Sequence, residues 1–146
     1  MDTSNNSCNA EHTTTMQNEP PSLLIREASP KTPDIYFNMP AGMLLIKGRS
    51  IPEDSFEYYM PLIRWLDAWT VRAKTITHTV TASFCIEYQN SASGKMLFEF
   101  MRKLIKLHNG GVSVIVNWYC LDEYMLEAGE EYRNLINIPF NLIECM

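Results

Sequence analysis

The 146-residue sequence contains no apolar run long enough to cross a bilayer, which takes about 20 residues. Its N-terminus lacks the charged-then-apolar pattern of a secretory signal peptide. Basic residues are also scarce, since 12 lysines and arginines face 17 aspartates and glutamates, for a formal charge of −5. Nucleic-acid binding depends on clustered lysine and arginine, so this balance argues against it. We therefore expect a cytoplasmic protein that binds neither membranes nor nucleic acids.

The sequence also lacks the short motifs that hold common cofactors. Neither the GxGxxG nor the GxxxxGK[ST] pattern is present, so no standard phosphate-binding loop is predicted. The cysteines and histidines show no CxxC, HxxxH or HExxH spacing, and we expect reduced structural thiols, no metal site and no cofactor. These scattered residues are Cys8, Cys85, Cys120, Cys145, His12, His78 and His108.

Composition divides the chain into a tail and one domain. Residues 1–31 are rich in Asn, Thr, Ser, Glu and Pro, and such a segment buries too little apolar surface to offset its ordering entropy. We interpret residues 1–31 as a flexible tail, in which the apolar Leu23-Leu24-Ile25 cluster is a candidate short strand. Residues 32–146 are long enough for a single domain with its own core.

Within residues 32–146 the hydrophobic pattern alternates between strand and helix periods. Strands are predicted at 33–38, 43–47, 80–88, 112–119 and 140–144. Helices are predicted from about 50 to 69, from 93 to 107 and from 122 to 133. A Ser50-x-x-Glu53 capping box would start the first helix, and Pro61 would kink or restart it. This order favours an α/β fold with a sheet covered by helices.

The most distinctive local feature is the turn of residues 90–94, which reads Asn-Ser-Ala-Ser-Gly between a predicted strand and a predicted helix. Free N–H groups and the positive end of the helix dipole would stabilise an anion there. The plainer interpretation is that Asn90 or Ser93 caps the helix and does nothing more. The turn lacks the GxSxG pattern of a nucleophile elbow, so we assign it no catalytic serine.

A second polar feature is the acidic segment around Glu127. On a short amphipathic helix such a run is usually a solvated face, although paired carboxylates could perform acid–base chemistry. A small enzyme using this helix stays open as an alternative function, as does a structural subunit that oligomerises through the aromatic-rich first helix. The carboxylates are those of Asp122, Glu123, Glu127, Glu130 and Glu131.

Six separated motifs occur in the order in which a known family carries them. They are residues 32–35, 48–55, 87–96, 116–119, 125–131 and 138–141. On these segments the chain resembles the SiaC family of regulatory phosphoproteins, over essentially residues 32–146. The order of elements also resembles the STAS fold of anti-sigma-factor antagonists. The resemblance implies a STAS-like mixed sheet of four to five strands covered by about three helices.

The resemblance also implies a phosphorylation site in the turn before the second helix. The family reads Asn-Thr-Ser-Ser there and its Thr accepts the phosphate, which implies Ser91 as the acceptor in this chain. Alignment on the Ser-Gly of the STAS antagonists implies Ser93 instead. The partner-binding residues that follow from the resemblance are Asn90, Ser91, Ser93 and Lys95.

A partner-switching circuit in cyclic di-GMP signalling and biofilm regulation follows from the same resemblance. An unphosphorylated member binds and activates a diguanylate cyclase. A kinase of the GHKL type phosphorylates it, and a PP2C-like phosphatase removes the phosphate. By resemblance, this chain is the messenger among these enzymes and has no catalytic residues of its own.

Overall fold

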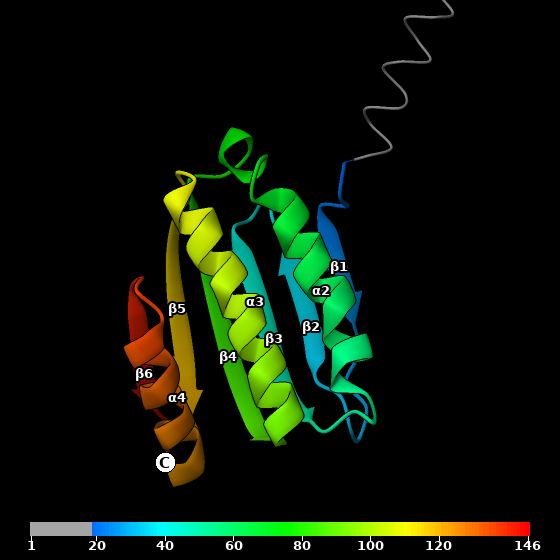
Figure 1. Ribbon diagram of the computed structural model, residues 1–146, viewed down its shortest axis with the longest axis vertical. Helices are drawn as coiled ribbons and strands as arrows, with labels where there is room; N and C mark the ends of the chain where they lie inside the picture. Colours follow the sequence, from blue (N-terminus) through cyan, green and yellow to red (C-terminus); the bar gives the residue numbers. More distant parts are fainter. Residues whose placement is uncertain (1–18) are drawn as a thin grey trace, which may run out of the picture.

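Residues 19–146 form one six-stranded sheet and three α-helices in a computed structural model (Figure 1). Residues 1–18 of the predicted tail, with Cys8 and His12, lie outside the described residues. The strands are β1 (Leu23–Arg26), β2 (Asp34–Asn38), β3 (Met43–Ser50), β4 (Thr79–Gln89), β5 (Ser113–Cys120) and β6 (Phe140–Glu144). They lie side by side in chain order. The pairings of β1 with β2 and of β2 with β3 are antiparallel, and those from β3 to β6 are parallel.

The mixed α/β sheet is confirmed, with one strand more than the sequence predicts. The additional strand, β1, comes from the segment predicted as tail. It pairs antiparallel with β2, and Leu24 lies opposite Phe37 and packs against the core. The Leu23-Leu24-Ile25 cluster is therefore a strand of the sheet, and the folded unit begins before residue 31. The tail interpretation does not hold for this part because pairing with β2 satisfies its backbone groups.

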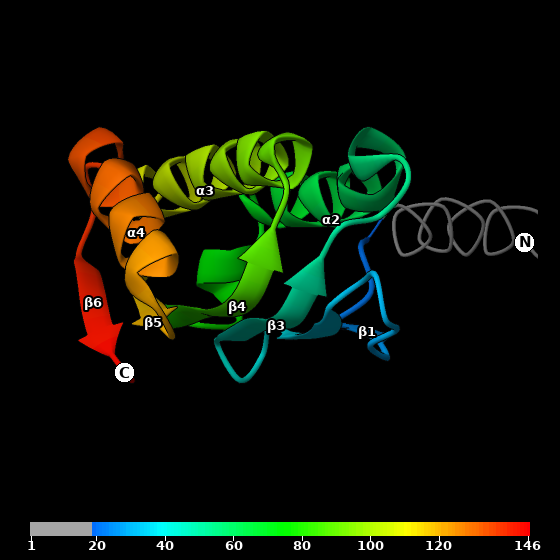
Figure 2. The ribbon, with the colours of Figure 1, turned by 90° about the horizontal axis from the view of Figure 1, so that it is seen from below.

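The three helices lie on one face of the sheet and leave the other face open (Figure 2). They are α2 (Ser55–Trp69), α3 (Ser91–Asn109) and α4 (Glu123–Leu135), and a 3₁₀ turn spans Ala73–Thr75. Each helix connects two neighbouring parallel strands. Because such crossovers are almost always right-handed, consecutive ones that advance in the same direction place their helices on the same face.

The start of α2 differs from the capping-box prediction. Asp54 is the N-cap, and its Oδ1 accepts a hydrogen bond from the backbone N–H of Glu57 at 3.0 Å. Ser50 instead ends β3 with its side chain buried, so the prediction of a cap at Ser50 is wrong. The helix also does not restart at Pro61, which is exposed and lies inside one continuous helix ending at Trp69.

Aromatic rings fill the core between the sheet and the helices. The ring centroid of Phe37 lies 5.2 Å from that of Trp65 and 5.4 Å from that of Phe100. Phe84 continues the cluster, with its centroid 5.8 Å from that of Trp118. The predicted inward face of α3 is confirmed, since its four residues are buried: Leu97, Phe100, Met101 and Leu104.

Most aromatic side chains of α2 belong to the core of the chain itself, whereas Phe56 is 60% exposed. Tyr59, Trp65 and Trp69 are buried, and both indole N–H groups donate to the carbonyl oxygen of Pro21, at 2.7 and 3.1 Å. These three buried rings are thus not available as an oligomerisation surface. The same two hydrogen bonds attach the segment before β1 to α2.

The contact of α4 with the sheet depends on Gly129. A Cβ atom at this position would lie 2.5 Å from Cδ1 of Trp118 and 2.6 Å from Cδ2 of Leu142. Carbon atoms do not approach so closely. Glycine therefore allows α4 to lie against β5 and β6, although it is a poor helix former.

Gly129→Ala is expected to destabilise the fold by about 1–3 kcal/mol, because the added methyl group overpacks the contact with Trp118. Urea unfolding followed by tryptophan fluorescence measures the change. The matched control is Glu130→Ala, an exposed position on the same helix, for which we expect a change of less than about 0.5 kcal/mol. A parent-like stability of Gly129→Ala would show that α4 can shift away from the sheet without cost.

A chain that starts at residue 23 is expected to melt a few degrees below a chain that starts at residue 19. The shorter chain lacks Pro21, whose carbonyl oxygen accepts hydrogen bonds from the indole N–H groups of Trp65 and Trp69. The longer chain keeps it. Leaving such donors without a partner costs about 1–3 kcal/mol. Thermal denaturation followed by circular dichroism compares the two chains, and equal melting temperatures would contradict a stabilising role of this attachment.

Candidate functional site

The turn before α3 has the cap geometry that the sequence predicts. Asn90 has an extended backbone, and its Oδ1 accepts a hydrogen bond from the N–H of Ser93 at 2.8 Å. Of the two candidate caps, Asn90 is therefore the N-cap. Its own N–H donates to the carbonyl oxygen of Ser50 at 3.2 Å, which ties the turn to the end of β3.

The two candidate phosphoacceptors differ completely in accessibility. Ser91 is the first residue of α3, and its side chain is exposed. Ser93 is 0% exposed. The Ser93 Oγ accepts a hydrogen bond from the Ser50 Oγ at 2.9 Å and lies 3.2 Å from the Ser55 Oγ. A kinase could reach Ser93 only by opening the start of α3, whereas Ser91 is already at the surface.

Ser93 belongs to a buried hydroxyl cluster, defined as Ser50, Ser55, Tyr59 and Ser93. The Ser50 Oγ and the Tyr59 hydroxyl lie 2.5 Å apart. Burial raises the pKa of Tyr59, so its phenol is neutral near neutral pH. The cluster joins the end of β3, the first turn of α2 and the first turn of α3, and it holds the turn from the side of α2.

A second hydrogen-bond network holds the turn from the side of α4. The Tyr132 hydroxyl donates to the carbonyl oxygen of Gly94 at 2.8 Å and accepts from Gln89 Nε2 at 3.1 Å. Burial raises the pKa of Tyr132 to about 12, so this phenol also stays protonated. A Cβ on Gly94 would lie 3.1 Å from Gln89 Nε2, so glycine leaves room for these bonds. The network fastens α4 to the start of α3.

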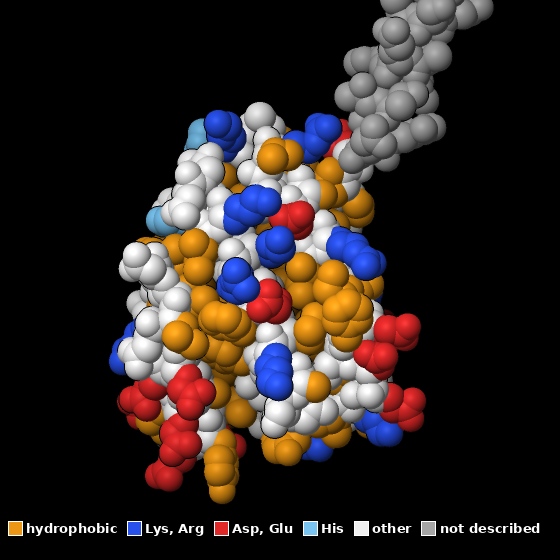
Figure 3. Space-filling model, in the orientation of Figure 1, with side chains coloured by type: hydrophobic (Ala, Val, Ile, Leu, Met, Phe, Trp, Pro, Cys, Tyr) orange, Lys and Arg blue, Asp and Glu red, His pale blue; other side chains and the backbone are white. Residues whose placement is uncertain are grey.

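The surface is hollowed on both sides of Ser91. One hollow of about 480 Å³ lies between α3 and α4, and one of about 630 Å³ lies between the end of β4 and the start of α4. Figure 3 shows apolar side chains between α3 and α4, basic side chains over α3 and acidic side chains over α4. Both hollows are lined by Gln89, Ser91, Gly94 and Ala128.

The four predicted partner-binding residues separate into two pairs. Asn90 and Ser93 hold the turn in place through the cap and the hydroxyl cluster. Ser91 and Lys95 are exposed and lie four positions apart, on the same side of α3. Lys95 takes part in no ion pair within residues 19–146. Of the four, Ser91 and Lys95 are thus the exposed pair.

The acidic segment around Glu127 has the arrangement of a solvated helix face. Glu127 and its acidic neighbours are exposed. Asp122 is the N-cap of α4, and its Oδ1 accepts from the N–H of Met125 at 2.9 Å. Within residues 19–146 no group of three Cys, His, Asp or Glu residues is placed to hold a metal ion. Nor does this part of the chain contain a helix with the length and apolarity to span a membrane.

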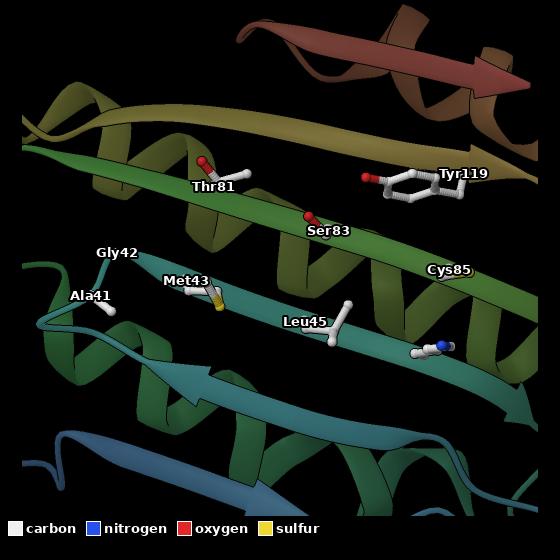
Figure 4. Close-up of a pocket in the computed structure, with 9 residues that line it drawn as sticks. Ala41, Gly42, Met43, Leu45, Thr81, Ser83, Cys85 and Tyr119 are labelled. Atoms are coloured by element: carbon white, nitrogen blue, oxygen red, sulfur yellow. The ribbon is translucent and has the colours of Figure 1, made fainter.

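A further hollow lies on the open face of the sheet (Figure 4). Its floor consists of small side chains on β4, between larger ones on β3 and β5. Sequence alternation marks these residues as facing away from the core, but the depth of the hollow depends on how three strands align. It contains no residue of the turn or of α3. Among its lining residues are Met43, Leu45, Thr81, Ser83, Cys85 and Tyr119.

Comparison with known proteins finds relatives over most of the chain. The family model described as "SiaC family regulatory phosphoprotein" matches residues 26–145. An uncharacterized protein of Pseudomonas aeruginosa strain UCBPP-PA14 is 28% identical over 111 residues, which are 75% of this chain and 86% of that protein.

Solved structures of SiaC from Pseudomonas aeruginosa share the fold. Apo-SiaC has a TM-score of 0.76 and 26% identity, over 84% of this chain and 99% of SiaC. A structure of the diguanylate cyclase SiaD in complex with its activator SiaC matches with a TM-score of 0.75 and 26% identity, over 83% of this chain and 98% of that chain. The comparisons confirm the family and the fold that the sequence motifs predict.

Ser93→Ala is expected to lower the free energy of unfolding by about 1–2 kcal/mol, because the buried Ser50 hydroxyl loses its acceptor and the buried Ser55 hydroxyl loses its partner. Ser91→Ala is the matched control on the exposed side of the same turn, and it should change stability by less than about 0.5 kcal/mol. Chemical denaturation measures both. Equal stabilities of the two variants would contradict the anchoring role of the hydroxyl cluster.

Proposed function

Because the chain belongs to the SiaC family of regulatory phosphoproteins, we propose that it is a non-catalytic messenger controlled by phosphorylation of Ser91. In its unphosphorylated form it binds and activates a target enzyme in the cytoplasm, and phosphorylation releases the target. The target class is a diguanylate cyclase, since a structural relative is the activator of one. A GHKL-type kinase adds the phosphate and a PP2C-like phosphatase removes it.

The observation that carries the proposal is an exposed serine at the start of a firmly held helix. Ser91 opens a 19-residue helix whose first turn is fixed by the Asn90 cap. A phosphate there meets the positive end of the helix dipole and the N–H groups of the first turn that have no intrahelical acceptor. The ammonium of Lys95, one turn further along, adds a favourable charge. We therefore expect the fold to accept the phosphate without unfolding.

The phosphate acts on binding through its charge. It adds about −1.5 to −2 charges and three strong acceptor oxygens in place of one small hydroxyl group. If the partner covers Ser91, that charge becomes desolvated in the interface, where the single positive charge of Lys95 does not fully balance it. Such a charge costs several kcal/mol, which corresponds to a loss of affinity of about 100-fold or more.

A messenger role also agrees with the surroundings of Ser91. A nucleophilic serine is activated by an adjacent base, usually a histidine. Within residues 19–146 no histidine or carboxylate accepts a hydrogen bond from the Ser91 hydroxyl group. His108, for example, uses its Nδ1 to accept from the N–H of Val114 at 3.0 Å. These surroundings favour a phosphoacceptor over a catalytic nucleophile.

Ser91→Asp is expected to lose most of its target binding while melting like the parent, and Ser91→Ala is expected to bind permanently. Immobilised variants are incubated with lysate of the cell that makes the protein, and mass spectrometry measures the recovered diguanylate cyclase. Ser113→Asp, at an exposed serine that opens β5, is the matched control and should bind like the parent.

Phosphopeptide mapping after kinase treatment completes this test. Modification of Ser91 is the expected result. An unmodified Ser91, or parent-like binding by Ser91→Asp, would contradict the proposed switch. Modification of Ser93 instead would keep the switch but move the acceptor, and it would require the hydroxyl cluster to open.

A further inference from the structure

The helical layer has a gap between α3 and α4. Helices α2 and α3 pack against each other, whereas a groove separates α3 from α4. The α4 helix is instead tied to the sheet at Gly129 and to the turn through Tyr132. The groove consists of the two hollows that meet at Ser91, and it is mostly apolar.

The α4 wall of the groove presents apolar side chains to solvent. Tyr124 is 78% exposed and Leu135 is 65% exposed. Together with Ala128 and Glu131, they recur every three or four residues and line the two hollows from one side. The 11 positions from Tyr124 to Leu135 correspond to about 16 Å, or three helical turns. Across the groove, Phe98 and Met96 of α3 add apolar surface.

The two walls carry opposite charges that do not neutralise each other. On α3, Lys95 lines the groove beside Ser91. The α3 carboxylate of Glu99 also lines it, but this group is paired with Arg102 at 3.4 Å. On α4, Glu131 lines it and Glu127 is exposed one turn earlier. None of the ion pairs within residues 19–146 joins α3 to α4. A ligand that fits must therefore offer negative charge towards α3, positive charge towards α4 and an apolar surface between them.

We propose that this groove receives an amphipathic α-helix of the partner protein, about three turns long. Its apolar face lies against Phe98, Tyr124 and Leu135, an acidic residue faces Lys95, and basic residues face the carboxylates of α4. Helix-in-groove recognition uses such apolar positions, spaced three or four residues apart. The inference rests on the proposed partner-binding role and specifies the chemistry of the partner.

The location of Ser91 explains how one phosphate would clear the groove. Ser91 and Lys95 are separated by four positions on one helix, so a phosphate on Ser91 is within reach of the Lys95 ammonium. The phosphate pairs with the Lys95 ammonium, which is then no longer free to pair with the acidic residue of the partner. The phosphate also repels that acidic residue. Binding is thus lost at one end of the groove while the apolar surface stays unchanged.

Site-specific photo-cross-linking in the cell that makes the protein tests this proposal. The full chain carries a photoreactive phenylalanine analogue at Tyr124, at Leu135 or, as the matched control, at Val71, which is 75% exposed and lies outside the groove. Mass spectrometry locates each attachment point in the captured protein. The three positions are exposed, so the substitutions should fold, and their melting temperatures verify this.

The expected result is attachment from Tyr124 and Leu135 to one segment of the partner, at points two to three helical turns apart. Adding Ser91→Asp should lower both yields about tenfold or more, because it places a carboxylate beside Lys95. Lys95→Glu should have a similar effect, whereas Lys74→Glu, at an exposed lysine outside the groove, should have none.

Three outcomes would overturn the proposal: yields at Tyr124 and Leu135 no higher than at Val71, attachment to a second copy of this chain, or attachment to an extended segment. The failure of the proposed function is a separate result. A helix captured from a protein other than a diguanylate cyclase would support the groove and contradict the target class. A cyclase recovered by Ser91→Ala without attachment at the groove would support the target class and contradict the groove.

Discussion

The buried hydrogen bond from Ser50 to Ser93 determines the geometry of the whole turn. Its oxygen atoms are 2.9 Å apart, and Ser55 and Tyr59 complete the group, so each buried hydroxyl has a partner. An unpaired hydroxyl in this position would be costly, and a fully paired group favours one arrangement of the three elements that meet there. Because Ser93 points inwards, Ser91 points outwards.

The turn is held from two sides, and the consequence is a surface that can change its charge without changing its shape. The hydroxyl cluster joins it to α2, and Tyr132 joins it to α4 through the carbonyl oxygen of Gly94. Since α4 is attached at this end and at Gly129, it does not close over α3, and the groove stays open between them. A stable turn beside an open groove suits a protein that signals through one added phosphate.

Much of this architecture was determined by the sequence alone. Each strand from β2 to β6 and the inward face of α3 follow from hydrophobic periods that act over a few residues, and side-chain chemistry narrows the cap of α3 to Asn90 or Ser93. The family is also readable from the sequence, because six separated motifs occur in the order in which the family carries them. The first residue of α2 could not be determined from the sequence, because a capping box at Ser50 and an N-cap at Asp54 satisfy the same local rules.

Only the tertiary structure decided which serine is accessible. Ser91 and Ser93 are two positions apart, and the local sequence offers both as hydroxyl groups at a helix start. The difference comes from Ser50, which lies 43 positions from Ser93 along the chain. Likewise, the short apolar segment of β1 lies in a polar region of the sequence, and it forms a strand only by pairing with β2. The groove depends on how far α4 lies from α3, which no single segment specifies. In each case the deciding contacts join residues that are distant in the sequence, and these contacts exist only after the chain has folded.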